Sequence, residues 1–168
     1  GIWSTGPGGA TVVPGINRIR VRASDGPDGT GRETASGYID VWYDLGMLLT
    51  DVTPLTQDTV LTKAGGPYRV AADLIVPVGI TLTLEPGAAL YFESGTQMIV
   101  YGRLLCEGTA TDRIRLTCNP STSSVWEGIV FDGTQEDNRL TWTAMDFAEG
   151  GAEAILVRNS RLLLDHMT

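Results

Sequence analysis

The strongest constraint on this fold is a series of very short strands separated by abrupt turns. In the stretch VPVGITLTLEPGAALYF, residues 76–92, apolar residues alternate with threonine from Ile80 to Leu84. This alternation is the period of a half-buried β-strand. Glu85-Pro86-Gly87 then ends the strand, because proline removes a backbone donor and glycine tolerates a positive φ. The alternation resumes at Leu90, so a second strand follows almost at once.

The same unit of short strand and turn recurs from Tyr68 to the C-terminal residue. Alternation places one set of apolar side chains on the inner face of these strands: Ile80, Leu82, Leu84, Leu90, Phe92, Met98, Val100, Leu104, Cys106, Ile114, Leu116, Ile129, Phe131, Leu140, Ile155, Val157, Leu162 and Leu164. The connections are mostly Glu-Pro-Gly, Glu-Ser-Gly and Glu-Gly-Thr, whereas tight hairpins favour Asn-Gly or Asp-Gly. Corners that do not reverse the chain stack one coil on the next. We therefore predict an all-β fold in which residues 68–168 form a right-handed parallel β-helix, with coils of about 20 to 25 residues.

Residues 1–44 follow a different pattern. The stretches TVVPGINRIRVRAS and GYIDVWYD each alternate, and the polar loop DGPDGTGRETASG lies between them. This predicts an antiparallel β-hairpin with an exposed tip. Two or three strands do not make a stable sandwich alone, so we expect the C-terminal strands of a partial Ig-like β domain. Direct packing on the residues that follow is the alternative. Residues 45–67 are expected to form a connector, with a short strand near Thr59–Leu61.

Composition excludes several kinds of partner. Of the 168 residues, 42% are hydrophobic, so a core can form. The formal net charge is −8, which argues against nucleic acid and anionic membrane, because both bind clustered Lys and Arg. No apolar run approaches the ~20 residues of a membrane span. The first and last residues read like the interior of a longer chain, so we expect the rest of a larger protein to be one partner.

Several of these segments together resemble a known kind of sequence. Pro77–Gly87, Gly102–Thr109, Ile114–Thr117 and Trp126–Ile129 resemble the first coils of right-handed parallel β-helix regions in large secreted bacterial proteins. Cys106 departs from the pattern, which has a small alanine there. The preceding PGINRIRVRASDGPDGTG and IDVWYD look like the Ig-like tail before such regions, in chains that also carry lamin-tail or CotH-like modules.

The resemblance implies an extracellular or cell-surface location within a multidomain parent. We expect a non-catalytic structural or interaction module that contacts polysaccharide. One alternative is a fragment of a polysaccharide lyase or glycoside hydrolase, since such enzymes use this fold, although fold alone transfers no activity. Another is a self-assembling solenoid, because the strand in RLLLDHMT presents an open edge that pairs end to end with another chain.

Outward aromatic residues are the candidate ligand contacts. Alternation places Tyr91 and Tyr101 on the outer surface, and Trp142 is a further candidate. Aromatic rings are flat apolar platforms, suited to stacking on sugar rings, and tyrosine adds a hydroxyl. The alternative is that these residues cover a coil corner or contact another domain of the larger protein.

Other groups carry weaker expectations. Asp25, Asp28 and Glu33 offer oxygen ligands for calcium, although they miss the EF-hand spacing and are also ordinary turn residues. Cys106 and Cys118 are expected to be buried thiols, with a disulfide between them as the alternative.

No catalytic residue is assigned. The strand-ending acids Glu85, Glu93 and Glu107 are expected to be solvated corner residues, and the group Asp132, Glu136 and Asp137 to lie in a surface loop. The single histidine, His166, follows Asp165 and is expected to be structural.

Overall fold

The computed structural model describes residues 15–27, 30–43, 47–49, 54–119, 125–149 and 153–168. It divides the chain into two compact units, Gly1–Leu45 and Gly46–Thr168. Each unit is described separately below.

The first unit contains an antiparallel β-hairpin. Strand β1 (Gly15–Ser24) pairs with β2 (Glu33–Tyr43), with Ile19 opposite Ile39 and a register shift at Ala23/Ser24. Across the loop, the N–H of Asp25 donates to the carbonyl of Arg32 at 3.1 Å. The predicted hairpin with an exposed tip is therefore confirmed. Strand pairing in this unit is limited to these two strands among the described residues, so the hairpin does not by itself define an Ig-like sandwich.

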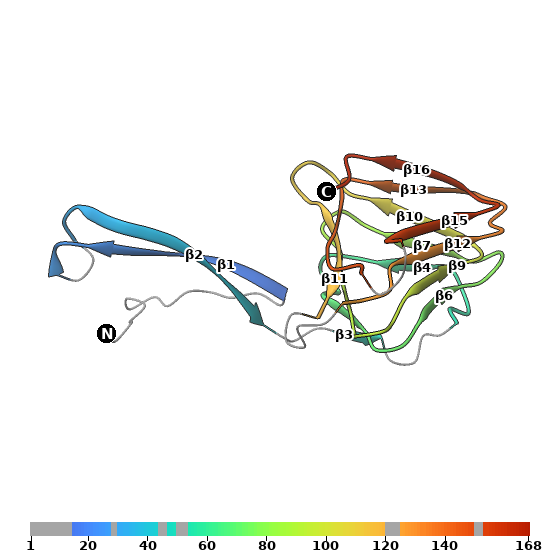
Figure 1. The fold of residues 1–168 in the computed structure, drawn as a ribbon, viewed down its shortest axis with the longest axis horizontal. Coiled ribbons are helices and arrows are strands. Elements are labelled where there is room, and N and C mark those ends of the chain that lie inside the picture. The colour runs from blue at the N-terminus through green and yellow to red at the C-terminus, as the bar shows by residue number, and fades with distance from the viewer. Residues whose placement is uncertain (1–14, 28–29, 44–46, 50–53, 120–124, 150–152) are drawn as a thin grey trace. The chain divides into compact units, whose positions relative to one another are not determined.

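The second unit is a stack of coils built from three parallel sheets (Figure 1). Sheet 1 consists of β3 (Met47–Leu49), β5 (Tyr68–Val70), β8 (Ala89–Phe92), β11 (Ile114–Cys118) and β14 (Thr143–Met145). Sheet 2 consists of β6 (Leu74–Val76), β9 (Met98–Val100), β12 (Ile129–Asp132) and β15 (Ile155–Arg158). Sheet 3 consists of β4 (Thr59–Leu61), β7 (Thr81–Leu84), β10 (Arg103–Glu107), β13 (Asp137–Thr141) and β16 (Arg161–Asp165).

From β5 onward the chain visits sheets 1, 2 and 3 in the same order in each coil, and the strands of successive coils pair in parallel. The prediction that corners rather than reversals join the short strands is confirmed. Tyr68 pairs with Leu90 one coil later, a spacing within the expected range. Leu105 pairs with Arg139, so that coil is longer than expected. Its added residues lie in the connections, because only the strands need to stay in register.

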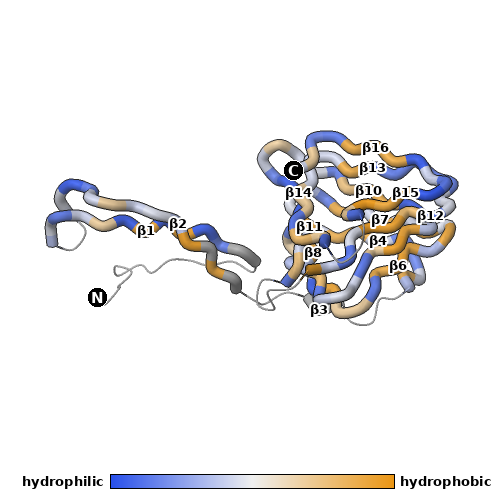
Figure 2. Tube along the Cα trace, viewed as in Figure 1, coloured by the Kyte–Doolittle hydropathy of each residue, from blue (hydrophilic) through white to orange (hydrophobic). Residues whose placement is uncertain are grey.

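The core lies inside the coils, and apolar residues recur along the stacked strands (Figure 2). The residues expected inside from Leu82 to Leu140 are all buried. Ile80, Ile155 and Leu162 are half-buried against this core. Val157 and Leu164 are 43% and 48% exposed, so their expected burial is wrong. They lie on β15 and β16, where the described residues place no further strand on the open side.

Two strands lie in the segment that was expected to be a connector. β4 is the short strand predicted near Thr59, and it pairs with β7. β3 was not predicted, and it pairs with β5. The coils of the second unit therefore begin before residue 68. A three-residue strand with a single apolar run gives no alternation from which it can be predicted.

Candidate functional site

Tyr101 lies at a tight corner between sheets 2 and 3. Only Tyr101 and Gly102 join β9 to β10, and both of their N–H groups donate to the carbonyl of Val76 at 2.9 Å. A Cβ on Gly102 would lie 2.1 Å from the carbonyl oxygen of Pro77, so only glycine fits. This corner directs the Tyr101 side chain outward, where the residue is 39% exposed. The outward position predicted for Tyr101 is therefore confirmed.

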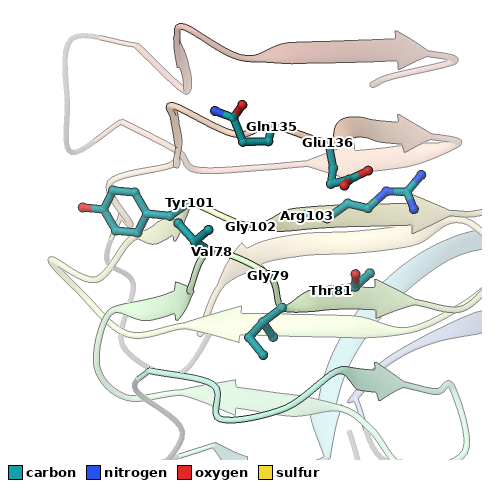
Figure 3. Close-up of a pocket in the computed structure, with 9 residues that line it drawn as sticks. Val78, Gly79, Thr81, Tyr101, Gly102, Arg103, Gln135 and Glu136 are labelled. Carbon is teal, nitrogen blue, oxygen red and sulfur yellow. The ribbon is translucent and has the colours of Figure 1, made fainter.

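One face of Tyr101 borders a hollow that we call the corner hollow. Its volume is about 360 Å³. Its lining consists of Val78, Gly79, Ile80, Thr81, Tyr101, Gly102, Arg103, Gln135 and Glu136. Figure 3 shows Tyr101 at one end and the side chains of Arg103 and Glu136 at the other. Arg103 is held in place because its Nε donates to the carbonyl of Asp137 at 3.1 Å.

Tyr101 also borders a second depression, the sheet hollow, on the outer face of sheet 2. Its volume is also about 360 Å³. Its lining consists of Gln97, Ile99, Tyr101, Glu127, Val130, Asp132, Glu153, Leu156 and Arg158. The floor is aliphatic, since Ile99, Val130 and Leu156 are register partners on successive coils. Each is partly accessible to solvent.

The sheet hollow is acidic. Glu127, Asp132 and Glu153 contribute three carboxylates against the single guanidinium of Arg158. Gln97 is positioned by Asp73, whose Oδ1 accepts its backbone N–H at 3.1 Å and whose Oδ2 accepts its side-chain amide at 3.4 Å. The two hollows together therefore offer an aromatic ring, an aliphatic floor, amides and carboxylates. This is the chemistry of a polar, non-covalent ligand contact.

Sequence reasoning missed the sheet hollow, although a signal for it was present. Strands β6, β9, β12 and β15 each begin with three consecutive apolar residues, such as Met98–Val100 and Ile155–Val157. A strand with one solvated face alternates, so the central apolar residue of each triplet indicates an apolar outer face.

Tyr91 does not belong to this site. It lies on β8 in sheet 1, between Arg69 and Thr117 in the register, and it is only 2% exposed. The prediction that Tyr91 presents its ring to solvent is therefore wrong. Alternation gives the side of a sheet but does not show what covers that side.

Trp142 lies at another corner, between sheets 3 and 1, directly after β13. Its ring stacks on that of His166 at a centroid separation of 3.9 Å, and the guanidinium of Arg113 lies 5.0 Å from the ring centroid. Both Trp142 and His166 have positive φ, 46° and 52°, and occupy equivalent corners of successive coils. The three aromatic candidates therefore do not form one surface.

His166 is also paired with its neighbour, because its Nδ1 lies 2.7 Å from Oδ1 of Asp165. The ring of His166 also stacks on Trp142. These contacts give Asp165 and His166 a structural role at the corner. Among the described residues, the structure gives the imidazole these two neighbours, an aspartate and an indole ring, and neither is a serine or thiol nucleophile.

Of the three candidate calcium ligands, Asp25 and Glu33 lie in the described part of the chain, and both contact other residues of the protein. Asp25 Oδ1 accepts the N–H of Arg32 at 2.8 Å. Glu33 pairs with Arg20 at 2.9 Å, and a hydrogen bond with Ser36 contributes most to lowering the pKa of its carboxyl group. Asp28 lies outside the described residues. In the part of the chain that is described, no three His, Cys, Asp or Glu side chains group as metal ligands. Calcium binding stays a prediction.

Both cysteines are buried thiols and no disulfide joins them, so the alternative of a Cys106–Cys118 disulfide is wrong. Burial raises the pKa of the Cys106 thiol well above its usual range, with a smaller contribution from the charge of Glu107. A thiol in this state is protonated and unreactive at neutral pH.

Of the strand-ending acids, Glu85 is exposed as expected, whereas Glu93 and Glu107 are engaged in ion pairs. Glu93 lies 2.7 Å from Arg69 and accepts a hydrogen bond from Asn119 at 3.0 Å. Glu107 pairs with Arg139 at 3.2 Å. Glycoside hydrolysis requires two carboxyl groups that face each other across a cleft. These pairs instead link neighbouring coils.

The fold therefore places this chain in a general class, the parallel β-solenoids, with an antiparallel hairpin as a separate unit. Comparisons with protein-family models, with curated proteins and with solved structures find no match to the chain. Within the described ranges, no helix is long and apolar enough to cross a membrane.

Proposed function

We propose that this chain is a non-catalytic structural and interaction module of a larger extracellular or cell-surface protein, and that it contacts polysaccharide through Tyr101. The observation that carries the proposal is the position of this ring at a glycine-fixed corner, where it borders two hollows at once. An extended polymer can cross such a corner and use both hollows. The extracellular location and the larger parent are supported by the sequence resemblance.

The lining of the two hollows favours a sugar polymer among possible ligands. The Tyr101 ring and the aliphatic floor at Ile99 and Val130 suit the apolar faces of pyranose rings. Gln97, Gln135 and the surrounding carboxylates suit hydroxyl groups, because amides both donate and accept hydrogen bonds. The excess of carboxylates in the sheet hollow disfavours polyuronates, so we propose a neutral or amino-sugar polymer.

The test is affinity electrophoresis and calorimetry with the whole chain, using neutral glucans, chitosan oligomers and polygalacturonate. We expect the neutral or amino-sugar polymer to bind, and Tyr101→Ala to weaken binding about tenfold, the loss of one stacking contact of roughly 1 kcal/mol or more. The matched control is Tyr38→Ala, which removes a tyrosine that is 70% exposed on the hairpin. Affinity should be unchanged in this control.

Equal binding by wild type and Tyr101→Ala would contradict the proposed site, as would binding of polygalacturonate alone. The same samples decide the enzyme alternative. New reducing ends or unsaturated products would show a glycoside hydrolase or a lyase, and we expect neither.

The Ig-like assignment of the hairpin belongs to the same proposal. One face of the hairpin is apolar, with Ile19, Val21 and Ala23 on β1 opposite Ile39, Gly37 and Ala35 on β2. A hollow of about 280 Å³ lies at this face beside Tyr38 and Ile39, which are 70% and 52% exposed. A two-stranded hairpin is marginally stable alone, so we propose that further strands of an Ig-like sandwich cover this face.

A further inference from the structure

The two hollows that meet at Tyr101 differ in charge. The lining of the sheet hollow contains three carboxylates and one guanidinium, so a net negative charge remains there. The lining of the corner hollow contains one of each, Glu136 and Arg103, so its formal charges cancel. A ligand that uses both hollows therefore meets two electrostatic environments, and complementarity requires a different substituent in each.

Two of the carboxylates in the sheet hollow, Glu127 and Glu153, occupy equivalent positions on adjoining coils. Each lies two residues before a member of the register pair Ile129–Ile155. Within the described ranges, neither side chain forms an ion pair. Like charges on adjoining strands repel each other, and a cation placed beside both of them removes this repulsion. The pair therefore favours a cationic group in the ligand.

The arrangement of the carboxylates suits an organic ammonium group better than a metal ion. In the part of the chain that the structure describes, no three acidic, His or Cys side chains group as metal ligands. The carboxylates instead lie before and after the strand residues that form the aliphatic floor, Ile99, Val130 and Leu156. A sugar ring that rests on this floor directs its substituents toward the carboxylates, and an amino group is complementary to them.

The corner hollow suits a sugar unit without charge. The Nε of Arg103 donates to the carbonyl of Asp137 at 3.1 Å, which fixes the guanidinium beside the carboxylate of Glu136 (Figure 3). Together they offer a donor and an acceptor to hydroxyl groups, while a cationic substituent is repelled by one and an anionic substituent by the other. Val78 is 73% exposed in the same lining as Tyr101, and it offers an apolar surface to the methyl group of an acetamide.

We propose that the ligand is a partially de-N-acetylated amino-sugar polymer, with an N-acetylated unit in the corner hollow and a free-amine unit in the sheet hollow. This assignment rests on the proposed polysaccharide contact at Tyr101, and it selects one polymer among the neutral and amino-sugar candidates. Because Tyr101 borders both hollows, its ring lies where the two units join.

The first test uses three β-linked glucosamine oligomers of equal length, measured by calorimetry with the whole chain in mildly acidic buffer, where the sugar amine is protonated. One oligomer is fully N-acetylated, one is fully deacetylated, and one alternates the two kinds of unit. The alternating oligomer should bind about tenfold more tightly than either of the others, because it alone complements both hollows. Equal or weaker binding of the alternating oligomer would overturn the proposal.

Substitutions in each hollow test where each unit binds. The double variant E127Q/E153Q should bind the deacetylated oligomer about tenfold more weakly and the N-acetylated oligomer as wild type does. The matched control E33Q/E85Q removes two negative charges at exposed positions outside both hollows, and it should change neither affinity. Val78→Asp places a charge beside the acetamide, so the N-acetylated oligomer should bind about tenfold more weakly.

Two results of these substitutions would contradict the assignment of units to hollows. One is an equal effect of E127Q/E153Q and E33Q/E85Q on the deacetylated oligomer, and the other is unchanged binding of the N-acetylated oligomer by Val78→Asp. Tyr101→Ala distinguishes this failure from failure of the polysaccharide site. If Tyr101→Ala weakens binding of all three oligomers but the alternating one is not preferred, only the assignment of units is wrong. If Tyr101→Ala weakens none of them, the site is wrong as well.

Discussion

At the residue scale, Cys106 shows that the interior of the coils disfavours an ionised side chain. Its side chain is fully buried on β10, among the inward residues of sheet 3, and burial raises the pKa of the thiol above its ordinary value of 9.0. Below pH 9.0 the thiol is neutral in both the folded and the unfolded state, so its burial contributes fully to the free energy of unfolding. Above it, only the unfolded chain ionises, so the free energy of unfolding falls as pH rises.

We predict that this fall distinguishes wild type from Cys106→Ala, which places at residue 106 the small alanine of the β-helix pattern. Between about pH 8 and pH 10, the free energy of unfolding of wild type should decrease by about 1.4 kcal/mol more than that of the variant. Urea denaturation at each pH measures both curves. Curves that stay parallel would mean that the thiol is not buried as described.

Asn138 has a structural role that sequence patterning did not reveal. It is 1% exposed and occupies an inward position on β13, between Leu104 and Leu162 of the neighbouring coils. Its Oδ1 accepts the N–H of Leu104 at 2.7 Å. Its Nδ2 donates to Thr134 Oγ1 at 2.8 Å and to the carbonyl of Arg161 at 3.2 Å.

Replacing Asn138 with leucine should therefore cost about 2 to 4 kcal/mol of unfolding free energy, because the buried N–H of Leu104 and other groups lose their partner. The matched control is Gln135→Leu in the exposed loop before β13, which should change stability by less than about 0.5 kcal/mol. Equal effects in urea denaturation would show that the inward amide does not link the coils.

At the element scale, the strands were predictable to the extent that they alternate. β7, β10 and β11 have clear period-two patterns, and their inward residues are all buried. β3 is too short to show a period. Trp126, before β12, is fully buried and stacks on Phe92 with 4.1 Å between the ring centroids. Its position depends on a long connection whose path no local pattern fixes.

The candidate site was predictable in part for the same reason. Tyr101 lies outside as alternation predicts. The corner at Tyr101–Gly102 was not predicted, because MIVYGRLLCEG reads as one continuous strand, whereas the structure divides it into β9 and β10. The two hollows beside it depend on residues from several coils, such as Ile80, Gln135 and Leu156. Their proximity is set by stacking between coils. Sequence patterns within one coil do not show which residues meet across coils.

At the scale of the whole molecule, one geometric fact underlies both the core and the Tyr101 corner: successive rungs of the second unit run in the same direction. Parallel stacking aligns equivalent corners, as it does for Trp142 and His166.

The most direct test of that fact is nuclear Overhauser spectroscopy on isotope-labelled protein, applied to the sheet 3 rungs β7, β10 and β13. The structure predicts parallel contacts that pair Thr83 with Leu105 and Leu105 with Arg139 in register. Strong Hα–Hα contacts between neighbouring strands, which mark close antiparallel pairs, should be absent from these rungs. Such Hα–Hα contacts between β7 and β10 would contradict the coiled fold and every proposal that rests on it.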